Sequence, residues 1–326
     1  MTDESKTGPA WRRRRWLSWI GIVLLAWLLW HLGPEKIAAV ISGTDLWLFV
    51  AATALYFPTI VLRIWRWQIL LRALGVSYGF VPAGQGYLIG ILIGLATPGR
   101  VGELTRAVFL KHDCGVPLVR GMPMVLVDRL FDFLVVLPFG VLALVSFGPA
   151  DAGSAWTAVA GLVAVMALGL GLILHKPSVD RLRLLVARIL PGARIGLKVA
   201  ELLAETNRGF RQIRPAIFVL ALSATVAAFA LFYLECFIIA KSLGMEATPL
   251  ATTYAISLGT LVAMVPLSIS GIGTRDGAIV AYLGLHGVPS PVAIGFSLLW
   301  FVAFYGMSAI LGTIAWGARN FTSPRL

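Results

Sequence analysis

The sequence has little charge, few cysteines and few histidines. Charged residues make up 13% of its 326 residues, whereas a soluble chain carries roughly a quarter. Its two cysteines, Cys114 and Cys236, provide no disulfide framework. Its four histidines stand singly, so the sequence predicts no metal site, and it contains no motif that indicates a cofactor. These shortages argue against a soluble enzyme, a disulfide-stabilised domain and a metalloprotein.

The chain is instead rich in apolar residues, which make up 59% of it. Its net charge of +12 would suit a nucleic-acid-binding protein. However, the basic residues stand between apolar segments, which is the distribution that the positive-inside rule produces in membrane proteins. The sequence therefore predicts an all-α protein that crosses a membrane several times and has no nucleic-acid partner.

Six apolar segments are long enough to cross a bilayer, which takes roughly 20 residues. They are 16–33, 46–73, 119–147, 155–174, 216–243 and 290–317. Two further apolar segments, 83–111 and 250–285, are interrupted by TPGRVGE and PLSISGIGTRD, respectively. Each interrupted segment is interpreted either as an ordinary crossing or as a re-entrant hairpin that enters and leaves on the same side.

The positions of lysine and arginine decide between these interpretations. With two re-entrant hairpins, basic residues collect in the cytoplasmic segments 1–15, 175–215 and 318–326, and the external loops keep only Lys36 and Lys241. With two ordinary crossings, the basic segment 175–215 would face outside. We therefore predict six crossings, two re-entrant hairpins, and both termini in the cytoplasm.

Matching residues recur along the chain at a nearly constant spacing. The matches are Pro82 with Pro249, Tyr87 with Tyr254, Pro98 with Pro266, and Gly140 with Gly312. They predict two repeats, 16–147 and 155–317, joined by an external loop at 148–154. Because each repeat contains three full crossings, the second is predicted to be inverted, as in secondary transporters whose sites lie near the bilayer midplane.

Two basic segments lie next to the apolar ones. The cluster Arg12–Arg15 precedes the first apolar segment without a cleavage site, which predicts an uncleaved first helix. The segment 175–215 has apolar residues at helical spacing with basic residues between them. It is interpreted either as an amphipathic helix on the membrane surface or as a solvated loop.

The break in the first hairpin combines helix breakers with charge. The breakers are Pro98, Gly99 and Gly102, and the charged residues are Arg100, Glu103 and Arg106. Non-helical backbone occurs at membrane depth only where it is buried in protein or lines a watery cavity. A helix N-terminus beside two arginines favours an anion, and guanidinium binds phosphate as a bidentate fork. We predict a substrate site here; the alternative is a set of ion pairs that only locks the hairpin.

More charges lie within other apolar segments. Asp128, Arg129 and Asp132 belong to segment 119–147. The second break contains Pro266, Ser270, Gly271 and Gly273, followed by Arg275 and Asp276. Charged residues at such depth usually face a bundle interior and mark a pathway, so we include them in the candidate substrate site. A purely structural role as ion pairs is the alternative.

Three remaining charges are expected to be structural. Arg63 and Arg66 alternate with Trp65 and Trp67, which predicts side chains that reach out to the membrane surface. Glu235 stands alone in segment 216–243. We interpret it as a packing or capping residue rather than a ligand.

Three stretches, PGRVGELTRAVFL, VDRLFDFL and PLSISGIGTRDGA, resemble the signature stretches of the lysylphosphatidylglycerol synthase transmembrane-region family. This family includes the flippase-like domain of the bacterial multiple peptide resistance factor, and the resemblance covers about 16–317. The signature residues that it implies are Glu103, Arg106, Arg129 and Asp132. Asp276 departs from the pattern, because many members have glutamate there. The resemblance implies a bacterial-type cytoplasmic membrane location and, since this sequence contains no aminoacyl-transferase domain, a transporter rather than an enzyme.

The leading hypothesis is a flippase that moves an anionic phospholipid or a lipid-linked head group between leaflets through a midplane cavity. Membrane lipids are then its partners, and Glu103, Asp132 and Asp276 are candidates for coupling transport to protons. The alternatives are an intramembrane enzyme acting on a lipid-linked substrate and a non-transporting scaffold for a lipid synthase.

Overall fold

The computed structural model describes residues 25–27, 29–97, 100–146, 193–264, 268 and 270–319. Every regular element among these residues is a helix, which confirms the predicted all-α class. The predicted crossing at 155–174, most of the crossing at 16–33, and the break residues Pro98, Gly99 and Pro266 lie outside the described residues.

Three helical stretches in the described part of the chain are long and apolar enough to cross a membrane. They are Leu46–Ala73, Pro215–Ser242 and Ser290–Gly317, each of 28 residues. At 1.5 Å per residue, each is roughly 42 Å long, which exceeds a hydrocarbon core of about 30 Å. The helix α7 (Leu118–Val145) also has 28 residues but carries charges in its middle. All four agree with the predicted segments to within two residues.

Two of these stretches change their helical geometry along their length. The first consists of α3 (Leu46–Ala54) and α4 (Tyr56–Ala73). Pro58, in the first turn of α4, has no N–H to donate to the carbonyl of Ala54, which explains the separation at Leu55. The last stretch consists of α14 (Ser290–Phe301), the π-helical turn η2 (Val302–Gly306) and α15 (Met307–Gly317). Such π turns are frequent at functional sites.

Each interrupted segment folds back on itself as a helical hairpin. The first consists of α5 (Phe80–Leu95), the 3₁₀ helix η1 (Val101–Thr105) and α6 (Arg106–Cys114), and the second of α12 (Pro249–Met264) and α13 (Thr274–Leu285). Glycines bring the legs of the first hairpin together, because Gly86 faces Phe109 and Gly90 faces Arg106. The second leg starts as a 3₁₀ helix rather than the predicted α-helix, directly after Arg100, whose left-handed φ of 56° turns the chain.

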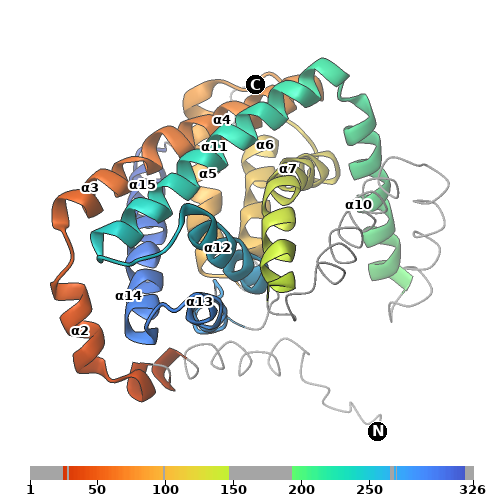
Figure 1. Ribbon diagram of the computed structural model, residues 1–326. Coiled ribbons are helices and arrows are strands. Elements are labelled where there is room, and N and C mark those ends of the chain that lie inside the picture. The colour runs from red at the N-terminus through yellow and green to blue at the C-terminus, as the bar shows by residue number, and fades with distance from the viewer. Residues whose placement is uncertain are drawn as a thin grey trace, which may run out of the picture.

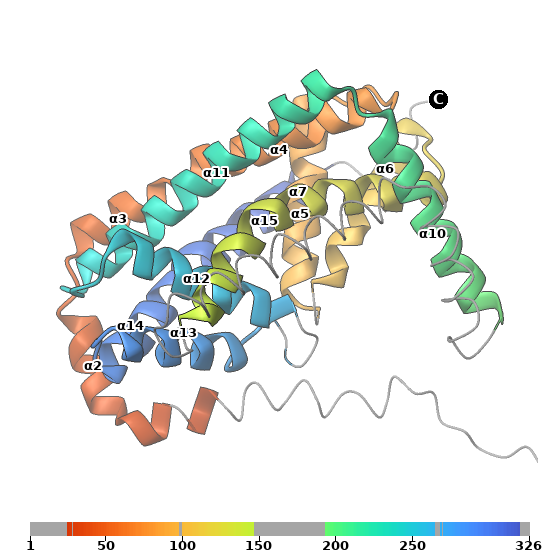
Figure 2. The same ribbon diagram turned by 45° about the vertical axis from the view of Figure 1, so that its right-hand side comes forward.

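Two of the long helical stretches form a layer on one side of the molecule, and the other two lie among the helices of the hairpins (Figure 1). The helices α4 and α11 (Pro215–Ser242) lie side by side (Figure 1). Beyond this pair, α5 packs against α15, and α12 packs against α7. Figure 2 shows α2 (Pro34–Ser42) and α10 (Ala193–Gln212) at opposite ends of the molecule. The helix α10 occupies part of the predicted linker 175–215 and packs against α7.

Helices of equal length recur along the chain. The stretches that start at residues 46 and 215 both have 28 residues, and they lie 169 residues apart. The helices that start at 80 and 249, with 16 residues each, keep the same spacing. The last pair starts at 118 and 290, with 28 residues each and a spacing of 172. The residues of the pairs Pro82–Pro249 and Tyr87–Tyr254 are 167 residues apart. They therefore differ by two residues from the 169-residue spacing of the helices that contain them.

Gly140 and Gly312 occupy equivalent positions in this packing. An added Cβ at Gly140 would meet Leu261 and the Ser257 carbonyl of α12, and one at Gly312 would meet Leu92 and the Leu88 carbonyl of α5. The helical stretch that follows each hairpin therefore touches the first leg of the other hairpin.

The turn of the first hairpin depends on Gly102, which yields a first prediction. An added methyl group would come within 2.5 Å of the Ile93 carbonyl oxygen and 2.8 Å of the Gly94 amide nitrogen. Because these are backbone atoms, Gly102→Ala must separate the legs, and we expect a loss of roughly 1–3 kcal/mol of stability. Thermal unfolding in detergent measures it. Gly284→Ala is the control, since nothing lies within 4 Å of its added methyl, and equal melting temperatures would contradict this packing.

Outside the apolar segments, hydrogen bonds connect Arg319, which follows α15, to Asp113 of the first hairpin. Asp113 accepts hydrogen bonds from Tyr78 and from Arg319 Nη2, the latter at 2.5 Å, and His112 Nδ1 lies 2.8 Å from its other oxygen. Burial acts to raise the pKa of Asp113, but the hydrogen bonds from Tyr78, His112 and Arg319 outweigh it, so the pKa lies below its ordinary value. The carboxylate therefore stabilises the folded state in its ionised form.

This contact predicts a pH-dependent difference between the wild type and Asp113→Asn. A carboxyl group with a lowered folded-state pKa stabilises the protein above its unfolded pKa of about 4, and this contribution is lost as the pH falls through the folded value. The wild type should be more stable than Asp113→Asn near pH 7, by about 1–3 kcal/mol. The melting temperatures of the two proteins should converge as the pH falls, and a difference that stays constant with pH would show that the contribution of Asp113 does not depend on its ionisation.

Candidate functional site

The tips of the two hairpins meet through polar contacts. Ser270, in the second break, donates its hydroxyl to the carbonyl of Leu95 at the end of α5, at 2.5 Å. Arg100, in the first break, donates to the hydroxyl of Tyr305 at 2.5 Å, and Tyr305 donates to the carbonyl of Ser270 at 3.4 Å. Arg100 and Ser270 are also the two non-glycine residues with positive φ among the described residues. Such backbone conformations concentrate at binding and switch sites.

Arg66 is the centre of the charged cluster behind these tips. It is 1% exposed. Its Nε lies 2.9 Å from Asp128 Oδ1, and its Nη1 lies 2.7 Å from Asp132 Oδ1 and 3.1 Å from the hydroxyl of Thr225. The carboxylates lie one turn apart on α7, so one guanidinium on α4 holds both and contacts α11 as well. Arg66 thereby ties the three helices together.

Glu103 and Arg106 extend this cluster into the first hairpin. Arg106 Nη1 donates to Asp128 Oδ2 at 2.8 Å, and its guanidinium lies between the rings of Trp67 and Tyr87, 4.8 and 4.5 Å from their centroids. Glu103 pairs with Arg129. The hairpin therefore supplies one cation and one carboxylate to α7, and α7 supplies their counter-charges.

Arg275 and Asp276 form a separate pair in the second hairpin. Asp276 accepts from Arg275 at 2.5 Å, from Ser297 at 2.6 Å, and from the amide of Gly273 at 2.8 Å, so it caps the start of α13. The Arg275 guanidinium packs over Trp300, at 4.9 Å from the ring centroid. It also lies over Tyr305, which joins this pair to the hairpin contact made by Arg100.

A small cavity of about 30 Å³ lies between the charged cluster around Arg66 and the aromatic residues that pack against Arg275. Its charged lining consists of Arg63, Arg100, Arg129 and Asp132. Aromatic side chains of α11, α14 and the π turn also line it, together with Val136, Thr260 and Met264. Three guanidinium groups therefore face one space against a single carboxylate, and the volume suffices for a water molecule or two.

The charges of the cluster do not balance. Five arginines contribute to it, and three carboxylates of the described residues form ion pairs with four of them, whereas Arg100 donates to the hydroxyl of Tyr305. The arginines are Arg63, Arg66, Arg100, Arg106 and Arg129, and the carboxylates are Glu103, Asp128 and Asp132. An excess of two positive charges in a membrane interior is costly unless an anion joins it.

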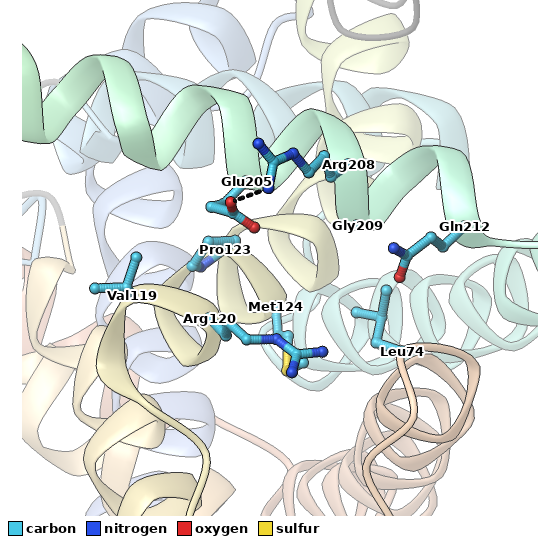
Figure 3. A pocket seen from close by; sticks show the side chains of 9 residues that line it. All are labelled: Leu74, Val119, Arg120, Pro123, Met124, Glu205, Arg208, Gly209 and Gln212. Atoms are coloured by element: carbon cyan, nitrogen blue, oxygen red, sulfur yellow. Dashed lines mark hydrogen bonds and ion pairs between the residues drawn. The ribbon is translucent and has the colours of Figure 1, made fainter.

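A larger pocket, of about 310 Å³, lies between the start of α7 and α10. Figure 3 shows Arg120 and Met124 on one wall and the Glu205–Arg208 ion pair, 2.7 Å long, on the other. Pro123 also lines it, and because proline has no N–H, the carbonyl of Val119 lacks its helical donor. Arg120, Met124 and Asp128 follow each other at intervals of four residues, so one face of α7 leads from this pocket to the charged cluster.

The structure brings most of the predicted site residues together. Glu103, Arg106, Asp128, Arg129 and Asp132 are connected by ion pairs, and Arg100 lines the same cavity as Arg129 and Asp132. Gly102, Ser270, Gly271 and Gly273 lie at the hairpin turns, where Gly271 and Gly273 have positive φ. Arg106 lies behind the cavity rather than in its lining, since Asp128 and two aromatic rings enclose its guanidinium.

The expectation that Arg63 and Arg66 reach the membrane surface was wrong. Both are buried and face Asp132. Their spacing contained a signal, because they continue at helical intervals the buried face of α4 that includes Tyr56 and Thr59. The neighbouring tryptophans instead suggested a position at the membrane surface. Trp65 is 40% exposed, but Trp67 is 1% exposed and therefore belongs to the interior.

These features define an α-helical membrane protein with an arginine-rich site where two hairpin tips meet. The chain belongs to the lysylphosphatidylglycerol synthase transmembrane-region family, whose model matches residues 18–312. This match confirms the resemblance found in the three sequence stretches.

Three relatives are 22% to 28% identical to this chain. A UPF0104 membrane protein of Methanothermobacter thermautotrophicus is 24% identical over 314 residues, which cover 89% of this chain and 93% of the relative. A UPF0104 membrane protein of Pyrococcus horikoshii is 28% identical over 127 residues, 38% of each chain. The glycosyltransferase AglD of Haloferax volcanii is 22% identical over 309 residues, which cover 83% of this chain and 49% of that protein.

Arg66→Met tests whether this cluster holds the fold. The substitution leaves Asp128 and Asp132 buried without their main counter-charge, which typically costs about 3–5 kcal/mol. We expect a large fall in melting temperature or a loss of folded protein in detergent. Arg72→Met is the matched control, because Arg72 lies on the same helix but is exposed. Equal stability of the two variants would contradict a structural role for Arg66.

Proposed function

We propose that this protein moves lipids with an anionic head group between the two leaflets of a membrane. The observation that carries the proposal is the cavity between the hairpin tips, which three arginines face and one carboxylate opposes. The family points in the same direction, since its name refers to a synthase of a lipid. Membrane lipids are then the partners of this chain.

The charge excess favours a phosphate group as the bound moiety. A guanidinium group presents a planar fork of donors that matches phosphate oxygens, and its hydrogen bonds to an anion are stronger than those between neutral groups. Arg63 leaves its Nε without an acceptor among the described residues. Bound phosphate would supply this acceptor and neutralise part of the excess charge.

The size of the cavity implies that the structure represents a closed state. A volume of about 30 Å³ accepts water but not a phospholipid head group. The larger pocket, at about 310 Å³, reaches the lower end of the range for ligand sites. In the proposed cycle a head group loads there, beside Arg120, and follows the face of α7 to the cluster once the hairpin tips separate.

The proposed architecture is an inverted repeat with two re-entrant hairpins. The equal helix lengths, the constant spacing and the reciprocal packing of α5 on α15 and of α12 on α7 support it. In this arrangement the hairpins enter from opposite sides, and their tips meet near the bilayer midplane. The termini and the segment 175–215 then face the cytoplasm.

The enzyme alternative is supported by the name of one relative, the glycosyltransferase AglD, and this chain spans about half of that protein. Formation of a modified lipid by the purified protein tests it. The scaffold alternative predicts that charge-neutral substitutions at Glu103 and Arg106 together leave the function of a partnered synthase unchanged.

Proteoliposomes with a fluorescent phosphatidylglycerol test the proposal, because a reductant added outside destroys the label in the outer leaflet only. The wild type should expose the inner-leaflet label to the reductant. Arg100→Gln and Arg129→Gln should slow this movement at least about tenfold, since each removes one hydrogen-bonded charge contact to the phosphate. Arg211→Gln, at an exposed position on α10, is the control. A wild-type rate equal to that of empty liposomes would contradict the proposal.

A further inference from the structure

Tyr305 connects the tips of the two hairpins through one hydroxyl group. This hydroxyl accepts a hydrogen bond from Arg100 Nη2, in the first break, at 2.5 Å, and it donates to the carbonyl of Ser270, in the second break, at 3.4 Å. Ser270 in turn donates its hydroxyl to the carbonyl of Leu95 at the end of α5. Arg100, Tyr305 and Ser270 therefore form a latch across the two tips.

The ring of Tyr305 is held in place independently of its hydroxyl. It stacks on Phe301, with ring centroids 4.7 Å apart, and it meets Trp300 at a right angle, with centroids 5.8 Å apart. Tyr305 is 3% exposed and belongs to the π turn η2. Because packing positions the ring, a phenylalanine in its place would keep these contacts and lose only the hydrogen bonds of the latch.

Arg100 is the member of the latch that can change partners. It is partly exposed and lines the cavity, so an anion can reach it before the tips separate. Its present acceptor is the neutral hydroxyl of Tyr305. A phosphate accepts two parallel hydrogen bonds from one guanidinium and carries the opposite charge, whereas a hydroxyl accepts one bond and has no charge. A phosphate in the cavity therefore displaces the hydroxyl from Arg100.

We propose that the hydroxyl of Tyr305 occupies Arg100 in place of the head-group phosphate, so that the binding of the cargo releases the latch. This proposal rests on the proposed function. When the phosphate takes the donors of Arg100, the hydroxyl loses its link to the first tip and keeps only the longer bond to Ser270. The tips can then separate and enlarge the cavity. Tyr305 is a positioning residue in this cycle, because it acts on the cargo through Arg100.

The affinity of Tyr305→Phe for lipid tests this competition. Calorimetric titration of the purified full-length protein with dihexanoyl phosphatidylglycerol gives Kd. In Tyr305→Phe, Kd should fall by about tenfold, because binding no longer has to break a hydrogen bond to a charged group. If Tyr305 only stabilised the fold, or if its hydroxyl contacted the cargo, this variant would bind equally or more weakly. Either result would overturn the proposal.

Tyr56→Phe is the matched control. Tyr56 is also a buried tyrosine, and its hydroxyl lies 2.7 Å from that of Ser308, but it does not line the cavity. This variant should bind with the Kd of the wild type. When Arg100→Gln is already present, adding Tyr305→Phe should leave Kd unchanged, since the competition acts through the guanidinium. A lower Kd in the control, or a fall in Kd that persists without Arg100, would overturn the proposal.

Hydrogen–deuterium exchange tests the latch in the wild type, without any substitution. The amide of Gly102 donates to the hydroxyl of Thr97, and the amide of Gly273 donates to Asp276. Lipid should accelerate exchange at these two tips, because backbone amides exchange through local opening. Slower or unchanged exchange at the tips, in protein that binds the lipid, would overturn this inference and leave the proposed function standing. If the wild type bound no lipid, both would fall.

Discussion

The interaction on which the rest of the structure depends is the fork of Arg66 across Asp128 and Asp132. It joins α4 to α7, and through Thr225 to α11, by bonds of 2.7 to 3.1 Å between buried side chains. Because Asp128 also receives Arg106, this fork fixes where the first hairpin lies against α7. The helices of this interior are therefore positioned by charge as much as by apolar packing.

A structure held together in this way need not carry excess charge, yet this one does. Arg66 and Arg106 use both aspartates, and Arg129 uses Glu103, so Arg63 and Arg100 remain with weak or neutral partners. Both face the cavity between the hairpin tips. The uncompensated charge therefore lies where the tips of the two hairpins meet, and discontinuous helices of this kind form the binding sites of many secondary transporters.

The membrane-length helices were predictable because a crossing leaves a local signal, a run of roughly 20 apolar residues. Glu103 and Arg106 could also be recognised as candidate site residues, since glycines and charges are unusual in such an apolar run. Arg66 was not recognised, because its aspartates lie 62 and 66 residues away, and local spacing does not reveal which helices pack together. Arg275 and Asp276 are buried, and the contact of Asp276 with Ser297 was not predictable, because it depends on the packing of α14 against α13.

The most direct test of the central claim is a cryo-electron microscopy structure of the protein in nanodiscs that contain phosphatidylglycerol. The account predicts density for a phosphate group within hydrogen-bonding distance of Arg63, Arg100 and Arg129, with the contact between Ser270 and Leu95 broken to make room for it. Lipid density confined to the outer surface of the helices, with the cavity still closed by its present contacts, would contradict it.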